Sequence, residues 1–77
     1  MTTVKVIFFA VSKDIFGTDL EFEDINNIGE LATKLNQISD SEVIKSFRYA
    51  VNNKIIDQYF QFENGTIISV IPPSSGG

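Results

Sequence analysis

Hydrophobic and polar residues alternate near the start of the chain, which is the pattern of β-strands. Thr3 to Val11 is rich in Val, Ile and Phe, and Asp19 to Glu23 carries an acidic residue at every second position. Gly17-Thr18-Asp19 has the composition of a turn, and two strands this close in sequence predict an antiparallel hairpin. Because Lys5 should face solvent, the parity of the strands assigns one set of side chains to the core. The expected core set of this hairpin is Val4, Val6, Phe8, Leu20 and Phe22.

The middle of the chain changes to the period of an amphipathic helix. Apolar residues recur there at a spacing that places them on one helical face. Asn27 is expected to be the N-cap, and Glu30 stands three residues later, in the position of a capping box. The periodic pattern ends at Ser39-Asp40-Ser41. The expected core face of this helix consists of Ile28, Leu31, Leu35 and Ile38.

The last third of the chain returns to strand patterns. Phe47 to Val51 and Lys54 to Ile56 are predicted to be strands, joined by a turn at Asn52-Asn53, a pair that tolerates positive φ. A tight turn is predicted at Asn64-Gly65. Thr66 to Ile71 is the predicted last strand, because the proline that follows it cannot continue a strand ladder.

The predicted order is hairpin, helix, short hairpin and final strand. A single amphipathic helix covers only one face of a mixed sheet, so the pattern predicts a two-layer α+β domain. This order is that of the ubiquitin-like β-grasp, in which the first and last strands lie side by side at the centre of the sheet. We therefore predict a β-grasp domain over residues 1–71 and a free, flexible C-terminal tail over residues 72–77.

Composition narrows the possible functions. The chain has 77 residues, 43% hydrophobic and 21% charged, which fits one small folded domain. It has no cysteine and no histidine, which excludes disulfides, a thiolate nucleophile, Ser-His-Asp chemistry and the commonest metal ligands. A net charge of −4 disfavours nucleic acid as a partner. The apolar stretch from Val4 to Val11 is too short for a membrane span and no signal peptide is evident, so we expect a cytoplasmic protein without a membrane partner.

The end of the chain, Pro72-Pro73-Ser74-Ser75-Gly76-Gly77, has no large apolar side chain. Two glycines without Cβ atoms can thread a narrow channel and approach another active site closely. Six extended residues reach about 20 Å, and two prolines stiffen the base of such an arm. Because a carboxylate is a poor electrophile, a terminal Gly77 would need activation by an ATP-using partner. We therefore expect chemistry to be performed on this chain rather than by it alone.

Several short motifs together resemble the small, sulfur-carrier subunit of molybdopterin synthase. The resemblance runs from Val4 to Gly77 and is most specific where Phe-Phe-Ala near the start combines with Pro-Pro-x-x-Gly-Gly at the end. The sequence departs from the family pattern at Lys13, often Arg; at Thr66, usually Asp; at Ile71, often aromatic; and at Ser74, often Val. The motifs that carry the resemblance are Val6-Ile7-Phe8-Phe9-Ala10, Gly17, Ala50-Val51-Asn52, Asn64-Gly65 and the six C-terminal residues.

The resemblance implies a carrier cycle that centres on Gly77. An E1-like adenylyltransferase, using ATP and magnesium, would activate its carboxylate, and a sulfurtransferase donor would convert it to a thiocarboxylate. The small subunit would then dock on the large subunit of molybdopterin synthase, in a heterotetramer, and pass the sulfur to cyclic pyranopterin monophosphate. The chain itself would bind no cofactor, and the catalytic residues for transfer would belong to the large subunit. The residues implied in tail insertion are Pro72, Pro73, Ser74, Ser75 and Gly76.

Strand parity predicts a surface for these partners. If the core set of the first strand faces the helix, Ile7 and Phe9 face away from it. Ser69 marks the outward set of the last strand, so Ile67 and Ile71 should face the same way. Exposed apolar patches of this kind usually mark partner surfaces. With Lys13, which replaces the arginine common in the family and would weaken a bidentate contact, the expected interface is Ile7, Phe9, Lys13, Ile67 and Ile71.

Other functions remain open on the sequence. A thiamine-type sulfur carrier would use the same chemistry, a ubiquitin-like modifier would be conjugated through Gly77 to lysines, and a simple binding module would not need its tail. The acidic residues of the second strand are expected to form a solvated face, with steering toward a basic partner as the alternative. Tyr49 and Tyr59 are expected to be partly buried by packing rather than to form a ligand shelf.

Overall fold

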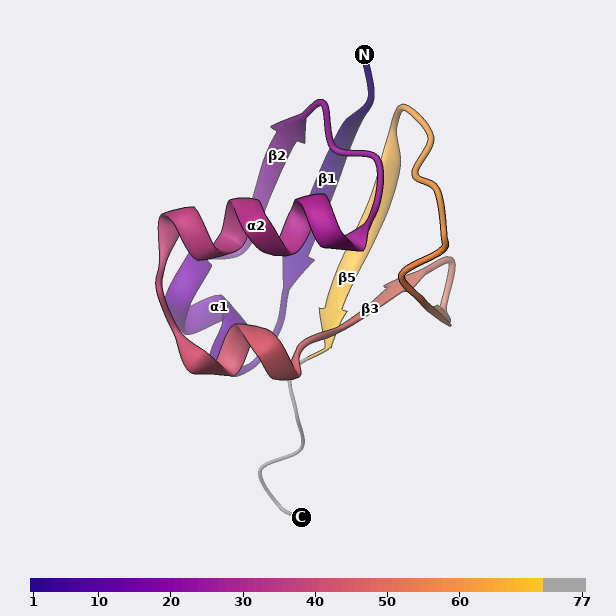
Figure 1. Ribbon diagram of the computed structural model, residues 1–77. Helices are drawn as coiled ribbons and strands as arrows, with labels where there is room; N and C mark the ends of the chain where they lie inside the picture. Colours follow the sequence, from indigo (N-terminus) through magenta and orange to yellow (C-terminus); the bar gives the residue numbers. More distant parts are fainter. Residues whose placement is uncertain (72–77) are drawn as a thin grey trace.

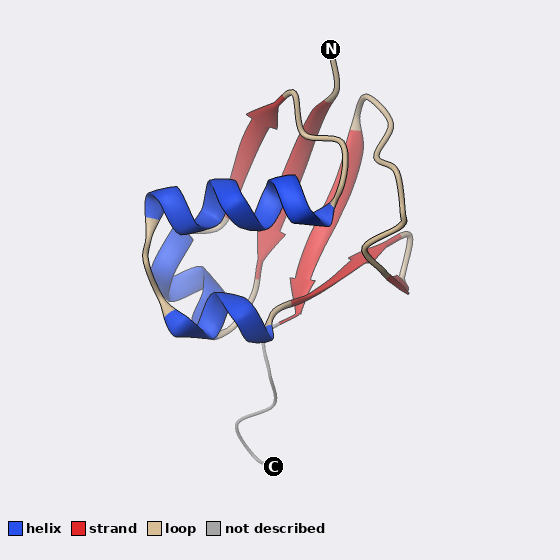
Figure 2. Cartoon of the chain, viewed as in Figure 1, coloured by secondary structure: helices blue, strands red, loops and turns tan. Residues whose placement is uncertain are grey.

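In the computed structural model, which describes residues 1–71, a five-stranded mixed sheet is covered on one face by helices (Figures 1 and 2). The predicted tail, residues 72–77, lies outside the described residues. Within residues 1–71 none of the helices is long and apolar enough to cross a membrane. In chain order the elements are β1 (Thr3–Phe8), α1 (Val11–Phe16), β2 (Asp19–Glu23), α2 (Ile28–Ile38), the 3-10 helix η1 (Glu42–Ser46), β3 (Arg48–Val51), β4 (Lys54–Ile56) and β5 (Thr66–Ile71).

The strands lie in the order β2-β1-β5-β3-β4, so the first and last strands of the chain are neighbours inside the sheet. β1 and β5 run parallel, and the other three pairs are antiparallel. This topology confirms the predicted ubiquitin-like β-grasp fold. Because β1 and β5 are parallel, their last residues, Phe8 and Ile71, lie at the same end of the sheet (Figure 1).

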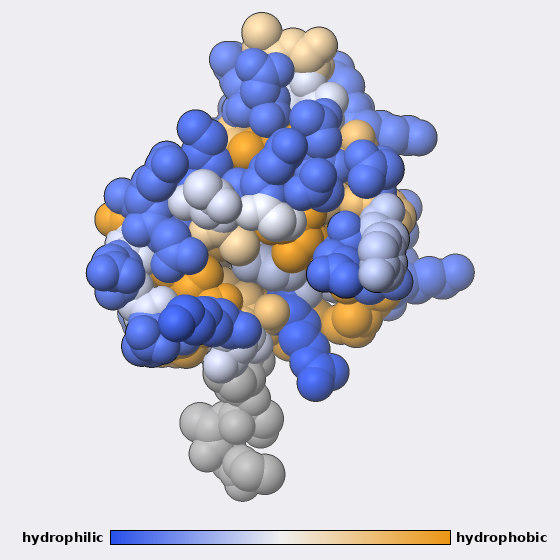
Figure 3. Space-filling view, in the orientation of Figure 1, coloured by the Kyte–Doolittle hydropathy of each residue, from blue (hydrophilic) through white to orange (hydrophobic). Residues whose placement is uncertain are grey.

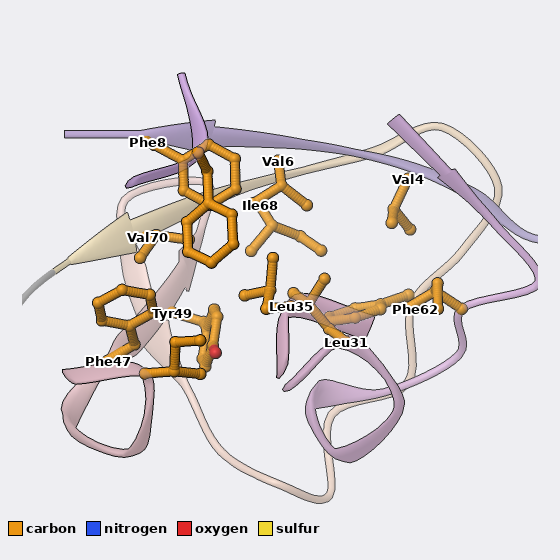
Figure 4. Close-up of a cluster of buried hydrophobic side chains, with 13 residues drawn as sticks. Val4, Val6, Phe8, Leu31, Leu35, Phe47, Tyr49, Phe62, Ile68 and Val70 are labelled. Carbon is orange, nitrogen blue, oxygen red and sulfur yellow. The ribbon is translucent and has the colours of Figure 1, made fainter. Parts of the chain in front are cut away.

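A single hydrophobic core fills the space between the sheet and the helices (Figure 4). Leu31 and Leu35 of α2 are fully buried and point toward the side chains of β1 and β5. The parity predicted for β1 is confirmed, because Val4, Val6 and Phe8 are all buried. The remaining buried members of the cluster are Phe16, Ile25, Ile44, Phe47, Tyr49, Phe62, Ile68 and Val70.

The bounds and N-terminal cap of α2 follow from its sequence. The Asn27 side chain accepts a hydrogen bond from the backbone N–H of Glu30 at 3.0 Å, as the capping-box prediction requires. The Glu30 carboxylate accepts from the backbone N–H of Asn26 at 2.7 Å, one residue before the cap. Ser39 is the C-cap. The prediction that Ile38 belongs to the core is wrong: its side chain is 54% exposed, because it is the last residue of α2 and lies beyond the core cluster.

Two short helices, α1 and η1, are not predicted by the sequence pattern, because each makes fewer than two turns and shows no clear period. β1 therefore ends at Phe8 instead of Val11, and Gly17, at φ 90°, ends α1 instead of forming a hairpin turn. α1 brings Phe16 to the core, and Phe47, the residue that follows η1, also lies there. The ring of Phe16 stacks on that of Phe8 at 5.0 Å between centroids, and the ring of Phe47 meets Phe16 edge-on at 6.4 Å.

Tyr49 and Tyr59 differ in their surroundings. Tyr49 is buried, and its hydroxyl has no hydrogen-bond partner among the residues that the structure describes. The prediction that Tyr59 is partly buried is wrong: it is 76% exposed, because it lies in the irregular segment after β4, where its backbone N–H donates to the Asp57 carboxylate. Burial without a partner for the phenolate raises the pKa of Tyr49 to about 12.

We expect this buried hydroxyl to cost stability, so the Tyr49→Phe variant should unfold with a free energy larger by about 1 kcal/mol. Because the pKa of Tyr49 is raised in the folded chain, the unfolded chain ionises first as pH rises. The wild type should therefore keep its full stability below pH 10 and lose roughly 2–3 kcal/mol between pH 10 and about 12. Urea unfolding of both proteins across this range measures the effect, and equal alkaline losses in the two would contradict it.

Candidate functional site

The sheet face opposite α2 carries a band of apolar side chains. Residues paired across neighbouring strands point to the same side of a sheet. Ile7 pairs with Ser69, Ser69 with Ala50, and Ala50 with Ile55, so one row of outward side chains crosses β1, β5, β3 and β4. Ile67 and Ile71 lie on the same face of β5, on either side of Ser69. We call Ile7, Ala50, Ile55, Ile67 and Ile71 the open-face patch.

The large side chains of the open-face patch are unusually accessible. Ile67 is 54% exposed, Ile55 57% and Ile71 39%, whereas Ile7 is half-buried and Ala50 is buried. The helix-covered side of the molecule, in contrast, is mainly hydrophilic (Figure 3). Isoleucines concentrated on one face of a small domain indicate a surface that a partner covers.

Charged side chains border the open-face patch. The outward side chains of β2 are acidic, and one of them, Asp19, lies 3.4 Å from the ammonium group of Lys5. This ion pair is half-exposed and contributes little to stability. At the other border Arg48 of β3 pairs with Ile71, so a basic residue lies beside the last described strand residue. The patch therefore has an acidic border on β2 and a basic residue near the end of β5.

A tight turn follows β1 and leads into α1. The Ser12 side chain is fully buried, where its hydroxyl donates to the carbonyl of Phe9 at 2.6 Å and accepts from the Phe9 backbone N–H at 3.1 Å. This pair of bonds fixes Phe9, which is 51% exposed. Lys13 is also exposed, in α1. The segment that follows β1 therefore exposes an aromatic ring on the turn and an ammonium group on α1.

Ala10 is strained within this turn, with φ 54° and ψ −132°. Conformations of this kind cost a residue with a Cβ atom roughly 1–3 kcal/mol, and glycine adopts them readily. The Ala10→Gly variant should therefore raise the free energy of unfolding by about 1 kcal/mol, which corresponds to about 5 °C in melting temperature for a domain of this size. Thermal unfolding followed by circular dichroism measures the change. A lower melting temperature for this variant would show that the turn is not strained.

The strand register confirms that Ile7, Ile67 and Ile71 face the same side of the sheet, as strand alternation predicted. Phe9 is exposed, although it lies beyond the end of β1, and Lys13 is on α1 instead of an extended strand. Their roles in partner binding stay predictions. The residues predicted to carry and insert the sulfur lie outside the described residues: Gly77 and Pro72, Pro73, Ser74, Ser75 and Gly76.

Sequence reasoning missed Ala50 and Ile55 as parts of this surface. Lys54-Ile55-Ile56 contains two adjacent isoleucines, so alternation alone does not say which of them faces outward. The register of β3 with β4 decides this, because Ile56 pairs with the buried Tyr49 and Ile55 with Ala50. The missing signal was strand pairing, which a single sequence does not contain.

A hollow of about 560 Å³ lies at the start of β5, lined partly by Phe60, Glu63 and Ile67 of the open-face patch. Glu63 is its one titratable side chain, and residues 1–71 contain no group of three or more side chains that could hold a metal ion. The open-face patch and the adjoining turn are therefore the candidate functional site.

Comparison with known proteins identifies a matching family and similar solved structures. The model of the ThiS family matches residues 6–77. Subunit 1 in the complex of subunits 1 and 2 of molybdopterin-converting factor from Helicobacter pylori is similar, with 27% identity, a TM-score of 0.76 and coverage of 99% of this chain and 100% of that one. No curated protein matched the chain.

Two further structures share the fold at lower sequence identity. A putative molybdopterin converting factor subunit 1 from Pyrococcus furiosus has 18% identity and a TM-score of 0.78, over 96% of this chain and 100% of that one. SAMP1 from Haloferax volcanii has 16% identity and a TM-score of 0.74, over 97% of this chain and 99% of that one. At these identities the likeness shows the β-grasp fold alone.

Proposed function

Because the chain belongs to the ThiS family of ubiquitin-like sulfur carriers, we propose that it carries the sulfur from which the dithiolene of molybdopterin is built. One observation carries the proposal. An exposed apolar face lies on the same strand, β5, that leads directly into Pro72 and the Gly-Gly end. A partner that covers Ile67 and Ile71 would therefore hold the chain immediately before the segment that carries the sulfur.

In the proposed cycle the reacting group is the carboxylate of Gly77. An E1-like adenylyltransferase with ATP and Mg²⁺ joins this carboxylate to AMP and releases pyrophosphate. A sulfurtransferase donor then supplies sulfur at the oxidation level of sulfide, which attacks the acyl carbon, displaces AMP and leaves a thiocarboxylate. The thiocarboxylate sulfur then forms a bond to cyclic pyranopterin monophosphate, and water cleaves the bond between this sulfur and the Gly77 carbonyl carbon. The carboxylate is thereby restored for another round.

We propose the large subunit of molybdopterin synthase as the partner that receives the sulfur, in a heterotetramer. The similarity to the Helicobacter pylori subunit, which was solved in complex with subunit 2, supports this choice. The open-face patch supplies the apolar contact area. Phe9 and Lys13 follow the end of β1, and Arg48 pairs with Ile71, the residue before Pro72. The chain provides the docking surface and the end group, whereas the large subunit provides the catalytic side chains.

A reconstituted reaction tests the product that the carrier serves. The thiocarboxylated chain is mixed with the large subunit and cyclic pyranopterin monophosphate, and molybdopterin is measured by its oxidised fluorescent derivative. A parallel reaction contains the thiazole-forming enzyme of thiamine synthesis and its substrates. Molybdopterin in the first reaction alone supports the proposal, and thiazole in the second alone would assign the chain to thiamine synthesis.

A further inference from the structure

The turn before β5 is tied to the first residue of β1 by two hydrogen bonds. The side-chain oxygen Oδ1 of Asn64 accepts from the backbone N–H of Thr3 at 2.9 Å. The backbone N–H of Gly65 donates to the carbonyl oxygen of Thr3 at 2.7 Å. Both bonds connect residues that are about sixty positions apart in the chain, so they depend on the β1–β5 pairing. The turn itself is exposed, and Gly65 has φ 88°.

An asparagine followed by glycine has a specific reactivity. The backbone nitrogen of Gly65 can lose its proton and attack the side-chain carbon Cγ of Asn64, because glycine has no Cβ to hinder the approach. A C–N bond forms, ammonia leaves, and a five-membered succinimide results. Water then opens the ring at either carbonyl, which gives aspartate or isoaspartate at position 64. No redox partner or enzyme is needed for either step.

We propose that Asn64 is a deamidation site and that its hydrogen bonds, and those of Gly65, to the backbone of Thr3 slow the reaction in the folded chain. The two atoms that must approach each other belong to the two groups that Thr3 holds: the Asn64 side-chain amide and the Gly65 nitrogen. While both bonds persist, the Gly65 N–H is occupied as a donor and the amide is fixed. Reaction therefore requires the start of β1 to separate from the turn, a local opening of the fold.

The products would affect the domain differently. Aspartate keeps an oxygen that can accept from Thr3, and adds one negative charge to a chain whose net charge is already −4. Isoaspartate adds a methylene group to the main chain between positions 64 and 65. That addition displaces the Gly65 N–H from Thr3 and disturbs the register in which Val4 pairs with Thr66. By slowing this reaction, the two hydrogen bonds to Thr3 protect the β1–β5 pairing at the end of the sheet opposite Ile71.

The test measures the rate of deamidation at Asn64 in the full chain by peptide mapping and mass spectrometry. The wild type is incubated in mildly alkaline buffer, folded or in concentrated urea. We expect the folded chain to react at least about tenfold more slowly, because reaction waits for local opening. Thr3→Pro removes the N–H that donates to Asn64 and keeps the carbonyl. With one bond lost, we expect its folded rate to rise about fivefold.

Thr2→Pro is the matched control, because it introduces the same residue one position earlier and leaves both hydrogen bonds between Thr3 and the turn intact. Its rate should equal that of the wild type. Equal wild-type rates in the folded chain and in urea, or equal rates for the two proline variants, would show that the hydrogen bonds to Thr3 do not slow deamidation. An unreactive Asn64 in urea would overturn the site itself. If Thr3→Pro does not fold, the wild-type comparison and the hydrogen-exchange protection of the Gly65 amide decide the question.

Discussion

Deletion of Gly77 is expected to abolish sulfur transfer and to leave the folded domain unchanged. The variant would end at Gly76, so its carboxylate would stop one residue, or about 3.5 Å, short of the position that the partner sites require. A shift of this size in a reacting group costs orders of magnitude in rate. Stability should not change, because every residue of the hydrophobic core cluster lies between Val4 and Val70. Molybdopterin formation in the reconstituted reaction and thermal unfolding measure the two effects.

The matched control for this deletion is Ser74→Ala, which changes the tail but keeps its length and its last two glycines. It should retain most of the activity. If the Gly77 deletion still transfers sulfur at the wild-type rate, the carboxylate of Gly77 is not the carrier group. Equal loss in the control and the deletion would indicate that tail composition matters more than the end group.

Replacement of Ile71 or Ile67 by aspartate is expected to weaken binding of the large subunit by about thirtyfold each. Each change places a carboxylate within an apolar contact area, and its desolvation on complex formation would cost more free energy than the paired residues, Lys5 for Ile67 and Arg48 for Ile71, could offset. Both side chains are substantially exposed in the free chain, 39% and 54%, so the free energy of unfolding should change by less than about 1 kcal/mol. Isothermal titration calorimetry against the large subunit measures the affinity.

Ile38→Asp is the control for the aspartate variants. Ile38 has the same exposed fraction as Ile67, 54%, but lies on α2, on the other side of the sheet. This variant should bind the large subunit like the wild type. Equal weakening by Ile38→Asp and Ile67→Asp would show that the open-face patch has no special role. Unchanged binding by all three variants would remove the patch from the interface.

The strands and the main helix could be predicted from the sequence because their patterns are long and consistent. β2 and β5 have the predicted bounds, since alternation defines the first and a proline follows the second. α2 begins at the predicted cap. The segments α1 and η1 were missed because their stability comes from packing, as when Phe16 stacks on Phe8, and little of that packing shows in a short local pattern.

The candidate site was predicted only in part, for a related reason. Parity along one strand identifies which face a side chain occupies, so Ile7, Ile67 and Ile71 could be assigned to one surface. The contribution of Ile55 depends on the pairing of β3 with β4, which requires knowledge of the register. The strain at Ala10 depends on how α1 follows β1, and is likewise a property of the folded chain.

The most direct test of the sulfur-carrier function is the intact mass of the chain after incubation with ATP, Mg²⁺, an E1-like activating enzyme and a sulfur donor. A reaction that thiolates another carrier of the family serves as the positive control. We predict a product heavier by one exchange of oxygen for sulfur, which fragmentation assigns to Gly77. A chain that keeps only its free carboxylate, or that appears joined through Gly77 to lysines of other proteins, would contradict it.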